Sequence, residues 1–164
     1  MDLTGYARMM ARYNRIANEL VMEKCALLDD GEYRRARRVS FGSVHALLNH
    51  MLLGDRIWMS RFEGGGSGTP ALNTVLFEDF AGLRAARVAE DARIEGFFAG
   101  VEAGFWDRPL RYVNSRWIDY VDAAPMAVVH FFNHQTHHRG QVHVLLAESG
   151  VGGPSLDLHR IANP

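Results

Sequence analysis

Apolar residues recur at steps of three and four along four long stretches of the chain, and this spacing predicts four amphipathic helices. The expected helices cover residues 3–28, 43–62, 78–102 and 125–149. Each is about twenty residues long or more, and the remaining sequence offers no convincing large sheet. The pattern therefore predicts an all-α fold in which the four helices form a bundle.

Glycine and proline separate the four stretches. Asp29-Asp30-Gly31 is expected to end the first helix, with Gly31 as its C-terminal cap, and a polar connection of about ten residues follows. The glycine-rich run at residues 64–68 ends the second helix, and the stretch to about residue 77 predicts a long crossover loop. Pro125 suits the first turn of the last helix, which Gly150 would cap.

Two shorter regions lie outside the predicted helices. Residues 109–121 alternate loosely around Asn114-Ser115, which favours a small hairpin before the last helix over an ordered loop. The tail at residues 153–158 is expected to pack back as an extended piece or as one short helical turn. The length of 164 residues fits a single domain over residues 1–164.

Composition narrows the range of partners. The formal net charge of −1 gives no global field that would favour nucleic acid. The basic cluster at residues 34–38 is offset by acidic neighbours, so a solvated connection is favoured over a site that steers anions. Cys25 is the chain's single cysteine, excludes an internal disulfide and is expected to be an inert core thiol. With neither a signal-peptide pattern nor a membrane-length apolar run, we expect a cytoplasmic protein without a membrane partner.

Histidines supply the candidate chemistry. His134 and His138 stand four residues apart in the last predicted helix, which places their Cβ atoms about 5–6 Å apart on one face. Two imidazoles at this spacing can bind one metal ion, and a third ligand should come from another helix. His50 lies beside the apolar stripe of the second helix and is favoured over His45. The alternative is that these histidines only satisfy local hydrogen bonds or lie at a dimer interface.

Other histidines of the last helix are reserve ligands, namely His130 and His137. Three segments of the chain, residues 38–50, 55–58 and 133–141, resemble the DinB/YfiT-like family of metal-binding four-helix proteins, which shares only a name with a translesion polymerase. The resemblance covers nearly the whole chain. It implies the metal ligands His50, His134 and His138, an antiparallel four-helix bundle with a long crossover between its second and third helices, and a homodimer.

Three neutral nitrogens leave at least one coordination position open for water or substrate. All-imidazole ligation suits zinc, nickel, cobalt or ferrous iron without choosing among them. Because characterised relatives use small thiols such as bacillithiol or mycothiol, the resemblance implies a metal-dependent small-thiol S-transferase acting on a small-molecule substrate. The alternatives are a metal-dependent hydrolase and a non-catalytic dimer that the metal stabilises or to which it responds.

Several neighbours of the histidines receive their own predictions. Asp55 is expected to hydrogen-bond a ligand histidine, or else to pair with an arginine of its own helix. Gln141 shares the face of His134 and is expected to contact substrate or bound water. Arg139 is expected in a surface or dimer salt bridge, with anion binding as its alternative, and Gly140 in close packing against another helix.

Overall fold

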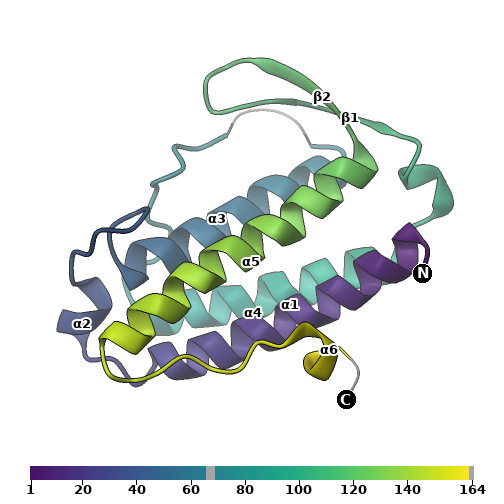
Figure 1. Cartoon of the computed structure of the whole chain (residues 1–164). Helices are drawn as coiled ribbons and strands as arrows, with labels where there is room; N and C mark the ends of the chain where they lie inside the picture. Colours follow the sequence, from purple (N-terminus) through teal and green to yellow (C-terminus); the bar gives the residue numbers. More distant parts are fainter. Residues whose placement is uncertain (66–68, 163–164) are drawn as a thin grey trace.

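The computed structural model describes residues 1–65 and 69–162, and this part of the chain is mostly helical (Figure 1). The helices are α1 (Leu3–Cys25), α2 (Asp30–Arg34), α3 (Val44–Phe62), α4 (Phe80–Gly100), α5 (Ala124–Glu148) and α6 (Leu158–Ile161), with a 3-10 turn at Ala103–Phe105. The strands β1 (Pro109–Val113) and β2 (Asp119–Ala123) form one antiparallel pair. The four long helices agree with the predicted ranges to within three residues at each end.

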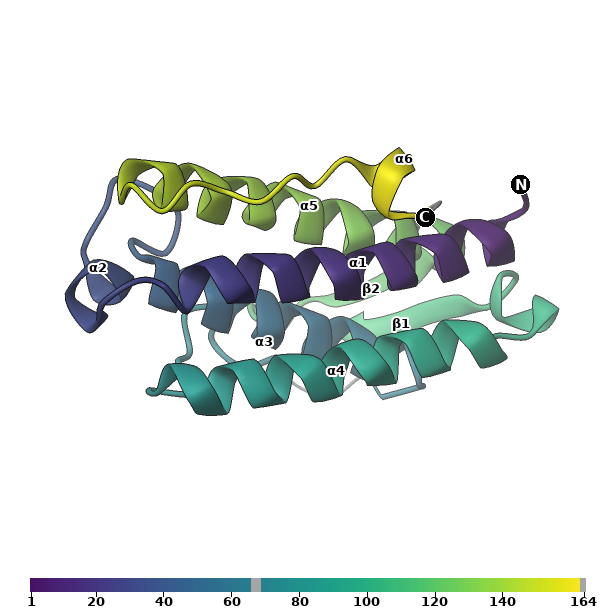
Figure 2. The same ribbon diagram turned by 90° about the horizontal axis from the view of Figure 1, so that it is seen from below.

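The four long helices pack as two neighbouring pairs. Helix α3 contacts α5 and α4, while α1 contacts α4 and α5. Figure 1 shows α3 and α5 side by side beneath the β1–β2 hairpin, and Figure 2, seen from below, shows α1 and α4 side by side. The hairpin contacts the two helices of the first pair, β1 against α3 and β2 against α5. The hairpin and its loop therefore cover the face formed by α3 and α5.

Side-chain caps explain where three of the long helices begin. The carboxylates of Asp2 and Asp79 and the hydroxyl of Ser43 each accept a hydrogen bond from the backbone N–H three residues ahead. Such caps satisfy N–H groups that have no partner within the helix. Helix α5 has no side-chain cap and instead carries Pro125 in its first turn, as predicted. Gly150 follows its end with a φ of +81°, a conformation that favours glycine.

The connection after α1 differs from the prediction. Gly31 does not cap α1, which ends at Cys25, but lies inside the short helix α2. The carboxylate of Asp29 accepts the backbone N–H of Glu32 at 2.8 Å and so starts a new helical turn. Sequence periodicity missed α2 because five residues are too few to show a stripe.

The basic cluster beside α2 is paired with nearby acidic groups. Arg34 bonds Asp30 at 2.9 Å, and Arg37 pairs with Glu32 and with Glu148 of α5. Arg37 thus ties the connection to the end of α5, and the charges of both arginines are already compensated. The interpretation as a connection rather than an anion-steering site agrees with this pairing.

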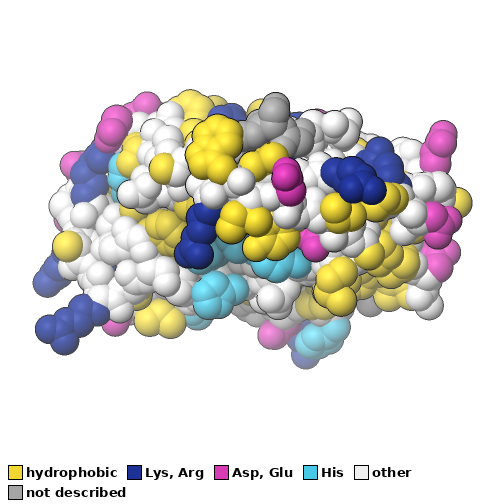
Figure 3. All heavy atoms as spheres, turned by 90° about the horizontal axis from the view of Figure 1, so that it is seen from above, with side chains coloured by type: hydrophobic (Ala, Val, Ile, Leu, Met, Phe, Trp, Pro, Cys, Tyr) yellow, Lys and Arg dark blue, Asp and Glu magenta, His cyan; other side chains and the backbone are white. Residues whose placement is uncertain are grey.

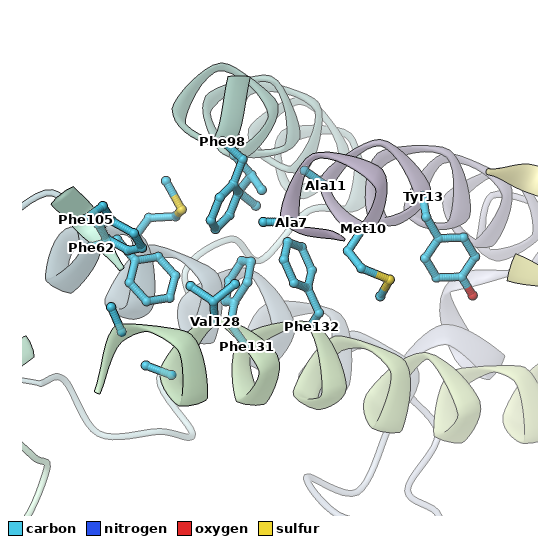
Figure 4. Packing of buried hydrophobic residues seen from close by; sticks show 14 of the residues in the cluster. Ala7, Met10, Ala11, Tyr13, Phe62, Phe98, Phe105, Val128, Phe131 and Phe132 are labelled. Atoms are coloured by element: carbon cyan, nitrogen blue, oxygen red, sulfur yellow. The ribbon is translucent and has the colours of Figure 1, made fainter. Parts of the chain in front are cut away.

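The buried apolar side chains form two clusters along the helices. One cluster is rich in phenylalanine and is drawn in Figure 4, where the ring of Phe98 from α4 lies close to those of Phe131 and Phe132 from α5. The other cluster is mainly aliphatic and surrounds Leu52 and Leu83. Cys25 belongs to the second cluster, and burial raises the pKa of its thiol to about 12, as expected for an inert core thiol.

The hairpin and the tail agree with their predictions. Strand pairing places Tyr112 opposite Tyr120, and Asn114 closes the turn by accepting two backbone N–H groups at 2.8 and 3.1 Å. The tail runs extended along the helices and ends in the short α6 (Figure 2). The hydroxyl of Tyr13 on α1 fixes it by donating to the carbonyl of Leu156 at 2.9 Å.

Part of the glycine run at 64–68 lies outside the described residues. Within residues 1–65 and 69–162, no helix combines the length and the apolar character that crossing a membrane requires.

Candidate metal centre

Three histidines converge where α3 faces α5. His50 comes from α3, and His134 and His138 come from successive turns of α5. One ring nitrogen of each lies within 4.8 Å of one from each of the others. Figure 3 shows histidine side chains gathered on this face beside hydrophobic and basic ones. The structure therefore brings together the three residues that spacing and resemblance selected.

Hydrogen bonds fix which nitrogen faces the cluster for two of the three rings, those of His50 and His138. Nδ1 of His50 lies 2.9 Å from the carbonyl oxygen of Leu72, and a carbonyl can only accept. Nδ1 of His138 lies 2.7 Å from Oε1 of Gln141, whose amide nitrogen in turn donates to Ser40. Both Nδ1 atoms therefore carry the proton, and both Nε2 atoms keep a lone pair. This is the arrangement that metal-binding histidines adopt.

The spacing of the inner nitrogens fits a shared cation. Nε2 of His50 and Nε2 of His134 are 3.2 Å apart. Two lone pairs at this distance repel unless a proton or a cation lies between them. Metal–nitrogen bonds of about 2.0–2.1 Å in a tetrahedron place neighbouring nitrogens about 3.3 Å apart. The chemistry and the spacing of the donor set both fit a divalent transition metal.

Burial keeps the three rings neutral. It lowers the pKa of His50 and of His138, and it lowers the pKa of His134 to about 3 with a further contribution from the neighbouring histidines. Neutral imidazole is the form that binds metal. The protein environment thus disfavours protons on the atoms that would bind an ion.

A glycine allows α5 to approach α3 at the cluster. A Cβ atom on Gly54 would lie 3.0 Å from Cε1 of the His134 ring, tighter than nearly all real contacts. Gly140 was predicted to pack closely against another helix, but this prediction is wrong. A Cβ there would meet no atom within 4 Å, and the residue is exposed.

Phe41 covers one side of the cluster and was not predicted. Its ring stacks on His50 with a centroid distance of 3.7 Å and lies edge-on to His138 at 5.8 Å. Its backbone has a φ of +65°, which is rare for a bulky residue, and Gly42 follows with +83°. Strained backbone of this kind persists where surrounding contacts impose it, often at functional sites. No periodic pattern signals such a residue.

The remaining histidines lie outside the cluster. Nε2 of His45 bonds the carbonyl of Phe77 at 3.1 Å, so the choice of His50 over His45 agrees with the structure. The ring of His130 lies 6.1 Å from that of His134, and His137 packs edge-on against His138. Both reserve residues are exposed on α5.

Asp55 has a different role from the one predicted. Its carboxylate accepts Nη1 of Arg87 at 2.6 Å and the side-chain amide of Gln135, rather than a histidine or an arginine of α3. Arg87 also pairs with Asp91 at 3.0 Å. Burial raises the pKa of Asp55 to about 7, although the Arg87 guanidinium opposes this shift. The residue therefore joins α3 to α4 and α5 inside the protein.

Arg139 belongs to the same buried system, so its predicted place at the surface is wrong. It is 1% exposed, and its guanidinium donates to Asn14 and to Asn18, both on α1. Asn18 also donates to Asp91 at 2.9 Å. We call these residues the inner polar network: Asn14, Asn18, Asp55, Arg87, Asp91, Gln135 and Arg139. It contains two acidic and two basic side chains, and it receives at least one residue from each long helix.

A pocket of about 250 Å³ opens beside the histidines. His50, Gly54 and His134 line it, and so do Thr69 and Leu72 of the segment between α3 and α4. The described residues that complete its lining are Ile57, Trp58, Arg61, Asn114, Ser115 and His130. The cluster is therefore continuous with a cavity large enough for a small molecule.

Comparison with known proteins identifies a family for the chain. The family model described as DinB family matches residues 1–164, the whole chain. A search of curated proteins finds no match. With helices, histidine cluster and family model in agreement, the chain belongs to the DinB family.

Proposed function

We propose that His50, His134 and His138 bind one divalent transition metal ion and that the protein is a metal-dependent small-thiol S-transferase. The convergence of two unprotonated Nε2 atoms with a third histidine carries this proposal. The donor set suits zinc, nickel, cobalt or ferrous iron. Such an ion lowers the pKa of a thiol or water bound at its open position.

The chain's own residues would prepare the two reactants. Gln141 and the Leu72 carbonyl hold the ligand rings in one orientation. The pocket beside Gly54 would hold the electrophile against the sulfur. As the sulfur forms its bond to carbon, the electron pair displaced from that carbon leaves with the departing group, and the thiol proton passes to His130 or solvent. His130 is the exposed imidazole that borders the pocket.

The first test is metal content, measured by mass spectrometry on protein purified without a histidine tag. We expect about one ion per chain in the wild type and none in His134→Ala. His137→Ala is the matched control, because this exposed residue of α5 lies next to a ligand but outside the cluster. A wild type that neither contains nor binds divalent ions would refute the site.

The second test concerns the reaction. Cobalt-substituted protein should change its visible spectrum when a small thiol is added, because sulfur coordination to cobalt is directly visible. Metal-dependent conjugation of the thiol to an electrophile would then support S-transfer. Absence of turnover over a broad set of thiols and electrophiles would refute it.

Hydrolysis is the second candidate, because His130 borders the pocket and could serve either reaction. An exposed imidazole beside the pocket can accept a proton from attacking water as readily as from a thiol. Azide and thiol should then both alter the cobalt spectrum, while only ester or amide substrates would turn over. A cobalt spectrum unchanged by either ligand would instead support the third candidate, a non-catalytic dimer stabilised by or responsive to metal.

We also infer the higher organisation that the resemblance implies. The four long helices are interpreted as the family's antiparallel bundle, with the segment between α3 and α4 as its long crossover. A cytoplasmic homodimer is proposed. Exposed apolar side chains on the hairpin, of which Trp117 is 83% exposed, support a protein interface there. Analytical ultracentrifugation of the wild type and Trp117→Ser tests the dimer.

A further inference from the structure

The pocket beside the histidines has a second chemical feature at its other end. Arg61 lies on the same face of α3 as Gly54 and follows it by seven residues, or about 10 Å along the helix. Both residues line the same cavity. A molecule bound there would therefore meet the histidine cluster at one end and a guanidinium group at the other.

Two aromatic rings hold the Arg61 side chain. Its guanidinium carbon lies 3.7 Å from the ring centre of Tyr112 on β1 and 4.5 Å from that of Trp58. One terminal nitrogen donates to the hydroxyl of Thr69 at 3.2 Å. Stacking covers the faces of a guanidinium and leaves N–H groups along its edge for a planar acceptor. The group is thus oriented before any ligand binds.

The charge of Arg61 lacks a carboxylate partner within the described residues. No acidic side chain lines the pocket there, and no described carboxylate oxygen lies within 4.0 Å of this guanidinium. The nearby carboxylate of Asp122 accepts the hydroxyl of Tyr112 instead. Arg56 on the same helix, by contrast, approaches Glu90 at 3.7 Å. Burial also lowers the pKa of Arg61, and the charge of nearby Asp122 opposes this shift without cancelling it.

We propose that Arg61 binds a carboxylate group of the substrate, so that the centre acts on small carboxylic acids whose reacting group lies at the histidine cluster. A carboxylate matches the planar edge of a guanidinium with two parallel hydrogen bonds. Asn114 and Ser115 of the hairpin turn supply further polar groups in the pocket. A volume of about 250 Å³ lies below the ~300–1,000 Å³ of pockets for drug-sized ligands, which restricts the class to small acids.

This inference rests on the proposed metal site, and the experiment separates the two. Cobalt-substituted protein is titrated with straight-chain mercapto acids, from 3-mercaptopropionate to 6-mercaptohexanoate, and with the matching amides. The thiol reports binding at cobalt, and the acid–amide pair isolates the contribution of the charge. We expect the acid to bind about ten-fold more tightly than the amide at the chain length that spans the pocket.

Variants assign that preference to one side chain. Arg61→Gln should bind acid and amide equally while retaining one cobalt per chain. Arg61→Lys should keep part of the preference, because it retains the charge but loses the stacked planar edge. Arg56→Gln is the matched control on α3 and should behave as wild type, since Arg56 does not line the pocket.

Each outcome has one meaning. Equal binding of acids and amides by the wild type, at every chain length, overturns the inference and leaves the metal site intact. A preference that persists in Arg61→Gln also overturns it. A wild type that binds no cobalt refutes the proposed function and this inference together. The comparison of acids with amides uses the wild type alone. It therefore tests the carboxylate proposal even if Arg61→Gln fails to fold.

Discussion

Two groups of polar side chains lie on opposite sides of the α3–α5 pair. They differ in whether their polar atoms remain available to bind a ligand. On the outer side, the histidine cluster directs unprotonated nitrogens toward one point. On the inner side, the inner polar network joins opposite charges that compensate one another. Adjacent residues of α5 serve the two sides, His134 outward and Gln135 inward.

The difference shows how buried polar groups can be assigned to structure or to chemistry. The charged side chains of the inner polar network are compensated by one another, so no ligand is needed to balance them, although some of its buried atoms, such as Gln135 Oε1 and Arg139 Nε, have no hydrogen-bond partner. The nitrogens at the centre of the histidine cluster differ, because Nε2 of His50 keeps a lone pair only 3.2 Å from Nε2 of His134, so that a proton or a cation must lie between them. Burial alone would not separate the two groups, since His50 is 4% exposed and Asp91 is also 4% exposed.

The largest expected effect is the loss of unfolding free energy when the inner polar network is broken. Asp55→Ala leaves Arg87 buried without its closest carboxylate, and removal of one partner from a buried pair costs about 3–5 kcal/mol. Urea denaturation of metal-free protein measures this loss. Glu63→Ala is the matched control, because its pair with Arg93 is exposed and should cost less than about 1 kcal/mol. A loss below 1 kcal/mol for Asp55→Ala would contradict the distinction.

A smaller effect should appear on the outer side alone. Gly54→Ala places a methyl group against the His134 ring, and overpacking of this kind costs about 1–3 kcal/mol. Because the ring that moves is a proposed ligand, metal affinity should fall roughly 10–100-fold, as measured by competition with a chelating dye. Unchanged affinity would show that the cluster tolerates a wider separation of α3 and α5.

The pH dependence of stability should also distinguish the histidine cluster from the inner polar network. In the unfolded chain His134 takes up a proton near pH 6.5, whereas burial holds its folded pKa at about 3. The unfolded state therefore binds more protons between these values, and stability falls as the pH falls through this window. Asp55 and Asp91, with pKa values raised to about 7 and about 6, act in the opposite direction because the folded state holds their protons.

The two contributions are separated by comparison with a variant. The difference in unfolding free energy between metal-free wild type and His134→Gln should decrease from pH 7 to pH 4, by at most about 1.4 kcal/mol per pH unit. His137→Gln, which changes an exposed ring, is the control and should show a much flatter dependence. Parallel curves for wild type and His134→Gln would contradict the lowered pKa.

The smallest effect has the opposite sign. Gly140→Ala adds a methyl group where a Cβ meets no atom within 4 Å, on an exposed position of α5. Alanine is favoured over glycine in a helix interior by about 1 kcal/mol, so the variant should be more stable by up to that amount. Thermal unfolding followed by circular dichroism measures the change. A destabilised variant would indicate that this position has a contact outside the single chain.

Much of this structure can be predicted from the sequence because helix periodicity is local. The spacing of apolar residues locates the four long helices, and the four-residue step from His134 to His138 selects a ligand pair without knowledge of the fold. His50 could be chosen over His45 from its place beside the apolar stripe. Each of these inferences depends on residues of one helix and on its regular geometry.

What could not be predicted depends on residues far apart in the chain. Arg139 was assigned to the surface because its partner asparagines lie on α1, and Asp55 was assigned to a histidine because Arg87 lies on α4. The role of Phe41 depends on a left-handed backbone conformation that leaves no periodic pattern. These errors share one cause, since a polar or aromatic residue in a helical stripe does not reveal what lies opposite it.

The bond between His50 and the backbone carbonyl of Leu72 has a consequence for how such sites diverge. A carbonyl is present whatever side chain the residue carries, so substitutions along the segment between α3 and α4 can reshape the pocket wall and still preserve the orientation of His50. The identity of the substrate and the integrity of the histidine cluster can therefore change independently. A single ligand set can serve many chemistries through exchange of loop residues alone.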